Sequence, residues 1–133
     1  YVQYGHARAA SILRRAAAQG VDLPASYEPA FGEALVLPEE LALAQELTRF
    51  PGVVASAASR REPHHVAFYL MELVKSMHSY YTRNKHTQRV ISEDVAKTRA
   101  RVFLIGCVKV VLARGLGLLG VTAPEEMRTG VEE

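Results

Sequence analysis

The sequence predicts an all-α protein, a bundle of about five helices. Apolar residues recur at helical spacing in several stretches, while no run alternates strictly between apolar and polar residues as a half-buried strand would. Proline and glycine separate these stretches from one another. The chain has 133 residues and is 49% hydrophobic, which is the size and composition of one globular domain. We therefore expect residues 1–133 to form a single helical domain, with 128–133 as a frayed tail.

The first helix is expected to span residues 1–19. Gly20 follows it, and a glycine suits the left-handed conformation in which many helices end. At about 100° per residue, one face of this helix gathers apolar side chains and should be buried. The members of this face are Val2, Ala9, Leu13 and Ala16. Residues 21–37 have no steady period, which predicts a loop with room for one short turn.

Two shorter helices should follow, over residues 38–50 and about 53–61, with a Pro-Gly pair breaking the chain between them. Pro38 suits the first position of a helix because its missing N–H is harmless there. Glu39 and Glu40 favour the positive end of the helix dipole. The side chains expected to face inward are Leu41, Ala44, Leu47 and Phe50.

A fourth helix is expected over residues 63–81, followed by a polar loop over residues 82–90. The helix carries an apolar stripe at helical spacing, which should face the core. The stripe consists of Val66, Leu70, Leu73, Val74 and Met77.

The fifth helix should be the longest, over residues 93–119, with Ser92 as its N-cap. Its C-terminal part is apolar almost all round, which predicts the central helix of the bundle. Lys109 and Arg114 lie within this apolar stretch, and each would cost about 2.5–3.5 kcal/mol in a bilayer, so a buried helix is expected instead of a membrane span. Residues 122–127 have the spacing of a capping box and predict one final turn.

Neither the composition nor the motifs point to catalysis in this chain. The single Cys107 excludes an internal disulfide and multi-cysteine metal sites, and its apolar helix should keep the thiol inert. His64 and His65 diverge on a helix and His78 lies more than a dozen residues further on, so no metal site is expected. The sequence has no phosphate-binding loop, dinucleotide fingerprint in a strand-helix context or nucleophile elbow. We expect no catalytic residue, metal or cofactor here.

The formal net charge is only +2, so a nucleic-acid partner would have to be held by a local patch. The chain opens at Tyr1 without an initiator Met or a secretory signal, and it reads as part of a longer protein. A reducing cytoplasm is compatible with its cysteine content.

Two clusters of aromatic and cationic residues stand out. The Tyr–Arg row occupies an arc of roughly 80° on the first helix, away from its apolar face; it consists of Tyr1, Tyr4, Arg8, Ser11 and Arg15. The second cluster follows the fourth helix and consists of Tyr80, Tyr81, Arg83, Lys85, His86 and Arg89. Either cluster is compatible with an ordinary solvated surface. The alternative is a surface on which unstacked bases lie against phenol rings and guanidinium planes, worth about 1–3 kcal/mol per base.

The opening run YVQYGHAR, residues 1–8, is more specific than its helical period requires. It resembles the start of the helical anticodon-binding domain of arginyl-tRNA synthetases, a family of class I aminoacyl-tRNA synthetases, where the run is typically Tyr-x-Gln-Tyr-Ala-His-x-Arg. The resemblance covers nearly the whole chain, in order. It continues through REPH at 61–64, MHSYY at 77–81, VLARGLGLLGV at 111–121 and APEEM at 123–127.

The resemblance implies a bundle that docks the anticodon loop of arginine tRNA. A Rossmann-type catalytic domain of the same protein, outside these residues, would use ATP and Mg²⁺ to attach arginine, so this part alone should be non-catalytic. A cytoplasmic monomer with no membrane partner is expected. The family's contacts to anticodon nucleotides carry over onto Tyr1, Tyr4, Arg8, Tyr81 and Met127.

Arg83 and Lys85, together with Arg89, would supply salt-sensitive attraction to the RNA backbone. His6 belongs to the family motif, but it lies beside the apolar face and is expected to be structural. The chain departs from the family pattern in having Gly5 for the usual Ala and Glu126 where Arg is common.

Two alternatives stay open. The domain could be the equivalent part of a cysteinyl or glycyl synthetase, against which the opening motif argues. It could also be a helical protein-interaction module, because Tyr and Arg are enriched at protein hot spots as well.

Overall fold

A computed structural model of the chain describes residues 1–83 and 90–127. Within these residues the structure contains helices and no strands, which confirms the all-α prediction. Five helices have eleven residues or more, and a sixth, α2, is a short helix inside the segment predicted as a loop. The helices are α1 (Val2–Ala18), α2 (Pro29–Ala34), α3 (Pro38–Thr48), α4 (Phe50–Arg60), α5 (His64–Arg83) and α6 (Val95–Leu118).

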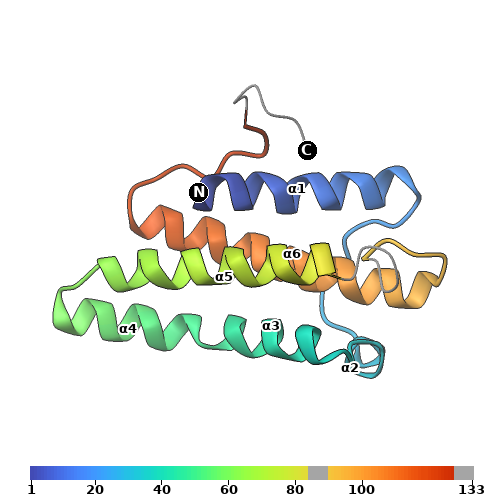
Figure 1. Ribbon diagram of the computed structural model, residues 1–133, viewed down its shortest axis with the longest axis horizontal. Helices are drawn as coiled ribbons and strands as arrows, with labels where there is room; N and C mark the ends of the chain where they lie inside the picture. Colours follow the sequence, from blue (N-terminus) through green and yellow to red (C-terminus); the bar gives the residue numbers. More distant parts are fainter. Residues whose placement is uncertain (84–89, 128–133) are drawn as a thin grey trace.

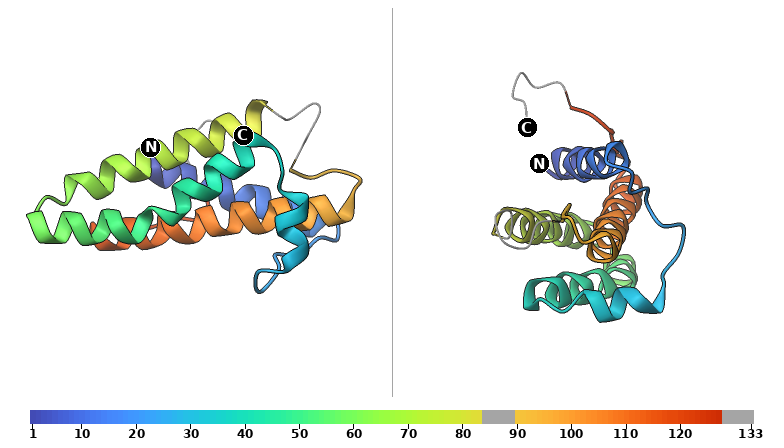
Figure 2. Two further views of the ribbon diagram at one scale, coloured as in Figure 1. Left: turned by 90° about the horizontal axis from the view of Figure 1, so that it is seen from below. Right: turned by 90° about the vertical axis from the view of Figure 1, so that its right-hand side faces the viewer.

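The long helices run roughly alongside one another in three layers (Figures 1 and 2). The end-on view in Figure 2 shows α1 on one side, α5 and α6 in the middle, and α3 with α4 on the other side. Helix α6 contacts α1, α2, α3 and α5, so it is the central helix, as its apolar circumference predicts. The core between the layers is apolar, and its most deeply buried side chains include Ile12, Leu43, Leu70, Leu73 and Ile105. Among the described helices, none combines the length and hydropathy of a membrane span.

Helix α1 ends as the sequence predicts. Gly20 has a φ of +89°, the left-handed conformation that a glycine adopts without strain. The amide of Val21 donates to the carbonyl of Ala16 at 2.9 Å and so closes the last turn. The buried face contains Ala9 and Ala16 as expected, but Ile12 is buried more deeply than Leu13.

The boundary between α3 and α4 lies two to three residues earlier than expected: α3 ends at Thr48 instead of residue 50, and α4 begins at Phe50 instead of residue 53. Arg49 separates the two helices, while Pro51 and Gly52 lie in the first turn of α4 instead of breaking the chain. A proline is tolerated there because the first turn of a helix has no internal partner for its amides. The predicted inward face of α3 is right in part. Ala44, Leu47 and Phe50 pack against the core, but Leu41 is exposed, whereas Glu40 and Leu43 are buried.

Helix α5 buries the predicted apolar stripe in full, and α6 begins slightly later than expected. The N-cap of α6 is Asp94 instead of Ser92, because the Asp94 side chain accepts a hydrogen bond from the amide of Lys97 at 3.2 Å. Ser92 instead meets Thr98, whose hydroxyl accepts a hydrogen bond from the Ser92 amide at 3.0 Å.

The C-terminal segment after α6 was predicted to form a final turn over residues 122–127, and this is wrong: the segment has no helical turn. It leaves the end of α6 and passes the start of α1 (Figure 1). Side chains of α1 hold its backbone: Gln3 Nε2 donates to the carbonyl of Thr122 at 2.9 Å, and His6 Nδ1 lies 2.7 Å from the carbonyl oxygen of Pro124. The predicted frayed tail, 128–133, lies outside the described residues.

Candidate nucleic-acid interface

The Tyr–Arg row lies on the side of α1 that faces α5. Tyr1 has 61% of its surface exposed, while Tyr4 and Arg8 are half-buried against the neighbouring helix. The rings of Tyr1 and Tyr4 lie 6.3 and 6.2 Å from the ring of His78 on α5. His78, which the sequence analysis considered as a metal ligand, therefore lies close to both tyrosines of the row.

Tyr81 of α5 joins the row at its other end. The guanidinium of Arg8 lies over the Tyr81 ring, 5.5 Å from the ring centre, in a cation–π arrangement. Arg15 Nη1 donates a hydrogen bond to the Tyr81 hydroxyl at 3.2 Å. We call the six residues Tyr1, Tyr4, Arg8, Arg15, His78 and Tyr81 the α1–α5 surface. Residues more than sixty positions apart in the sequence thus form one face of aromatic rings and cations.

A buried polar network fixes the end of α5 from which Tyr81 projects. The hydroxyl of Tyr80 donates to Glu40 Oε2 at 2.7 Å, and Arg101 Nε donates to the same oxygen at 2.7 Å. Glu40 Oε1 also accepts the backbone N–H of Leu37 at 3.1 Å. Burial, and then the hydrogen bond to Glu40, raise the pKa of Tyr80 far above its ordinary value, so this phenol stays protonated. The network joins α5 to α3 and α6.

The sequence suggested that Tyr80 belongs to a surface cluster, but the structure buries it. Successive residues of a helix differ by about 100°, so burying Tyr80 directs Tyr81 around the helix, toward α1. Arg83 differs from Tyr81 by about 200° and points to α3, where its Nη1 lies 3.8 Å from Glu39 Oε2. The structure thus separates Arg83 from the α1–α5 surface.

The other sequence-derived site residues fall in different places. Lys85, with His86 and Arg89, lies outside the described residues. Met127 is half-buried on the C-terminal segment, two residues after Glu125, whose carboxylate accepts from Lys109 Nζ at 2.9 Å. The hydrogen bond from Lys109 lowers the pKa of Glu125.

The side chains of α1 that hold the C-terminal segment are Gln3, His6 and Arg14. At about 100° per residue they lie on the other flank of the helix from the Tyr–Arg row. His6 is buried and bonded to the segment, so its position is that of a structural residue.

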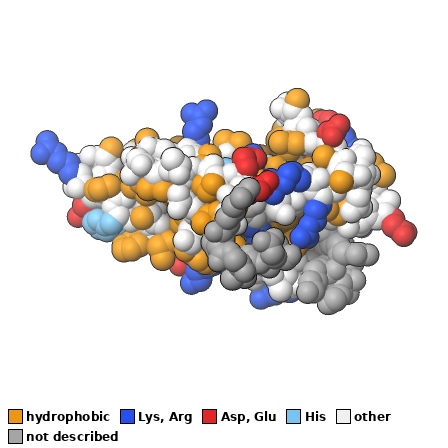
Figure 3. All heavy atoms as spheres, turned by 90° about the horizontal axis from the view of Figure 1, so that it is seen from above, with side chains coloured by type: hydrophobic (Ala, Val, Ile, Leu, Met, Phe, Trp, Pro, Cys, Tyr) orange, Lys and Arg blue, Asp and Glu red, His pale blue; other side chains and the backbone are white. Residues whose placement is uncertain are grey.

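Charges of both signs are mixed on the exterior. Figure 3 looks onto the molecule from the α1 side and shows Lys and Arg side chains next to side chains coloured as hydrophobic, a class that includes Tyr, with acidic groups among them. This agrees with a net charge of only +2. Among the described residues the charges are mixed, so a partner bound here would be held by local contacts.

The described residues offer little for catalysis. Burial raises the pKa of the Cys107 thiol, which disfavours the nucleophilic thiolate. Potential metal-ligand atoms of Glu62, His64 and His65 lie within 4.8 Å of one another at the start of α5. A 3.0 Å contact between Glu62 Oε1 and His65 Nε2 accounts for part of this proximity. The group lies at the opposite end of α5 from Tyr81.

Comparison with known proteins gives concordant results. Residues 2–127 match the family described as the DALR anticodon binding domain. The chain is 48% identical over 130 residues to an arginine–tRNA ligase of Anaeromyxobacter sp. (strain Fw109-5), covering 97% of this chain and 21% of that protein. It is 50% identical over 127 residues to the arginine–tRNA ligase of Syntrophotalea carbinolica, covering 96% of this chain and 22% of that protein.

A solved structure gives the same picture. The arginyl-tRNA synthetase of Thermus thermophilus superposes with a TM-score of 0.77 at 37% identity, over 96% of this chain and 21% of that one. The chain thus spans about a fifth of the length of the relatives it matches.

Proposed function

Because the chain belongs to the DALR anticodon-binding domain family, we propose that its α1–α5 surface recognises the anticodon loop of arginine tRNA. The observation that carries the proposal is the meeting of Arg8 and Arg15 from α1 with Tyr81 from α5. The two arginines belong to one of the clusters seen in the sequence and Tyr81 belongs to the other, and the fold brings them together on one face.

The chemistry of this face suits a single-stranded loop. Bases that leave the loop stack can lie on the rings of Tyr1, Tyr4 and Tyr81, and such stacking is worth about 1–3 kcal/mol per base. The guanidinium of Arg8 is already held over Tyr81, so little side-chain entropy is lost when it donates to a base edge or a phosphate. Arg15 adds a second donor at the same ring.

The parent protein, in this proposal, is an arginine–tRNA ligase. The relatives bear that name, and the chain accounts for about a fifth of their length. ATP and Mg²⁺ would serve the catalytic part of the parent, outside these residues, while this domain supplies an RNA contact and no chemical step. We propose a monomer that acts in the cytoplasm, where arginine tRNA is used for protein synthesis.

The proposal is tested by binding of the 133-residue chain to an anticodon stem-loop of arginine tRNA, measured by fluorescence anisotropy. Tyr4→Ala and Arg8→Ala should each weaken binding roughly 5- to 150-fold, which corresponds to about 1–3 kcal/mol. Their circular dichroism spectra should match that of the wild type. Arg60→Ala removes an exposed arginine from α4 and is the matched control, which should bind nearly as the wild type does. Unchanged binding in both test variants would refute the proposal.

Salt dependence separates RNA recognition from protein recognition. Cations that neutralise phosphates release counterions on binding, so the affinity for RNA decreases as salt is added. Arg8→Ala should therefore reduce the slope of log affinity against log salt concentration, by about 0.7 for each phosphate of a single strand that Arg8 neutralises. A domain that bound a protein partner through the same residues would not prefer the arginine stem-loop over stem-loops of cysteine or glycine tRNA.

A further inference from the structure

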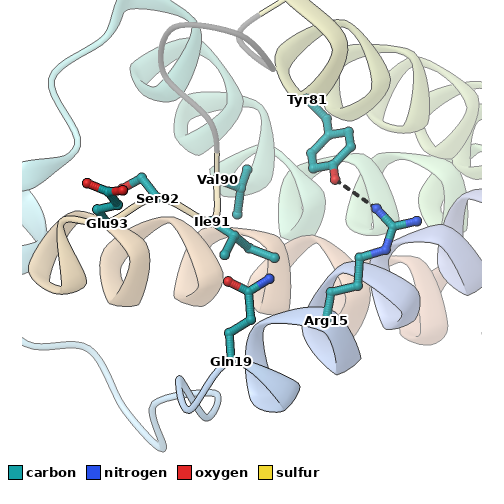
Figure 4. Close-up of a pocket in the computed structure, with 7 residues that line it drawn as sticks. All are labelled: Arg15, Gln19, Tyr81, Val90, Ile91, Ser92 and Glu93. Atoms are coloured by element: carbon teal, nitrogen blue, oxygen red, sulfur yellow. Dashed lines mark hydrogen bonds between the residues drawn. The ribbon is translucent and has the colours of Figure 1, made fainter.

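A pocket of about 380 Å³ opens at one end of the α1–α5 surface (Figure 4). Helix α1 contributes Arg15 and Gln19, α5 contributes Tyr81, and the segment before α6 contributes residues 90–93. Figure 4 shows Tyr81 and Arg15 joined at one end of the pocket, Ser92 with Glu93 at the other, and the Gln19 amide pointing toward Ile91 between them. The volume lies near the lower limit of small-ligand sites, roughly 300–1,000 Å³.

The lining combines an apolar floor with groups that can read a polar edge. Val90 is buried and Ile91 half-buried, so they form the apolar part. The Gln19 amide provides both a donor and an acceptor, and Glu93 provides an acceptor. The Ser92 hydroxyl is already engaged with Thr98 Oγ1 at 3.3 Å. A planar ligand with donors and acceptors on its edge fits this lining, and a nucleobase has that chemistry.

The pocket is continuous with the α1–α5 surface through two shared side chains, Tyr81 and Arg15. One aromatic residue, Tyr81, carries the Arg8 guanidinium on its ring and receives the hydrogen bond of Arg15 on its hydroxyl, and it also forms a wall of the pocket. Arg15 belongs to the Tyr–Arg row and lines the pocket as well. An RNA strand that follows the row along α1 from Tyr4 to Arg15 therefore arrives at the pocket.

We propose that this pocket, the Gln19 pocket, receives one unstacked base of the bound loop, and that the Gln19 amide hydrogen-bonds the edge of that base. The inference rests on the proposed function, because it places one more nucleotide of the same RNA. Gln19 thereby determines preference at a single position of the loop, while Tyr4 and Arg8 supply binding that does not depend on the pocket.

The test couples changes in the protein to changes in the RNA. Stem-loops of arginine tRNA are prepared with an abasic residue at each loop position in turn. Their affinities are measured for the wild type, Gln19→Ala and Gln19→Trp. Gln19→Ala removes the reading group, and Gln19→Trp fills the pocket from an exposed helix end. With the wild type, removing the pocket base should weaken binding roughly 5- to 150-fold. With either variant, the same abasic residue should weaken binding much less. This difference from the wild type should occur at one loop position only.

Gln45→Ala is the matched control, because it truncates an exposed glutamine on α3, which is not part of the pocket. It should leave every abasic penalty as in the wild type. If the Gln19 variants and the abasic residues act additively at every loop position, the pocket inference is overturned. The proposed function would still hold if Tyr4→Ala weakens binding in the same assay, and both would fail if Tyr4→Ala and Arg8→Ala bind as the wild type does.

Discussion

Replacing Glu40 by alanine should destabilise the fold far more than replacing its neighbour Glu39. Glu40 is 0% exposed and Arg101 is 2% exposed, and their ion pair is 2.7 Å long. Removing one partner of a buried pair typically costs about 3–5 kcal/mol, because the other charge stays in a poorly solvated site. The Tyr80 hydroxyl would also lose its acceptor, although the two losses share one oxygen and will not add fully. The total is a large part of the roughly 5–15 kcal/mol by which domains are stable.

The measurement is urea unfolding followed by far-ultraviolet circular dichroism, with the free energy of unfolding and the m-value fitted separately. Glu39→Ala is the control: its ion pair with Arg83 is 3.8 Å long and lies at the surface, so its removal should cost about 0–1 kcal/mol. Replacing Glu40 and Arg101 together by Met and Leu should cost less than Glu40→Ala alone, since no unmatched charge is then buried. If Glu40→Ala and Glu39→Ala lower stability equally, the buried network does not stabilise the fold in this way.

Three further changes test other parts of the structure. A Cβ at Gly5 would lie 2.5 Å from Val74 Cγ2, so Gly5→Ala should lower the free energy of unfolding in urea by about 1–3 kcal/mol, despite a gain of about 1 kcal/mol in helix propensity. Val74→Ala should relieve this destabilisation in the double variant. Purely additive effects of the two substitutions would contradict the close approach. Hydrogen bonds from Arg99 lower the pKa of Glu28 below its ordinary 4.5 in the folded chain, so the stabilisation is complete above that pH and is lost as the pH falls through the lowered pKa. Stability should therefore decrease less steeply in acid for Glu28→Gln than for the wild type, and parallel pH profiles would exclude the linkage. His6→Ala removes a hydrogen bond to the C-terminal segment, which should then exchange amide hydrogens faster while α5 stays protected; unchanged exchange would show that His6 does not hold the segment.

The sequence predicted the parts of the fold that depend on local patterns. The stripe of α5 and the apolar circumference of α6 are strong signals, because each repeats over several turns. On the inward face of α3, Ala44 and Leu47 were predicted correctly, but Leu41 was not, because the fold buries a charged residue, Glu40, and leaves Leu41 exposed. A buried carboxylate is stable only with its partners, and those partners come from α5 and α6, which no local pattern of α3 can reveal.

The candidate site, like the fold, was predictable only where it depends on a local sequence pattern. Helical periodicity placed Tyr1, Tyr4 and Arg8 on one face, and the structure keeps them there. The pairing of that face with Tyr81 depends on how α1 and α5 pack, so it is visible only in three dimensions. Arg83 was grouped with Tyr81 because the two are close in sequence, but residues two positions apart on a helix point in nearly opposite directions.

The attachment of the C-terminal segment to α1 has a consequence for the order in which the molecule is completed. Helix α1 is synthesised before the other described helices, yet two of the hydrogen bonds that secure its flank join residues 119 and 118 positions apart, Gln3 with Thr122 and His6 with Pro124. Contacts between such distant parts of the chain form only after the intervening chain has been made. A chain that stops before Thr122 therefore lacks both of these hydrogen bonds to α1. The helix that carries the tyrosines and arginines gains them only after residues 122–124 have been synthesised.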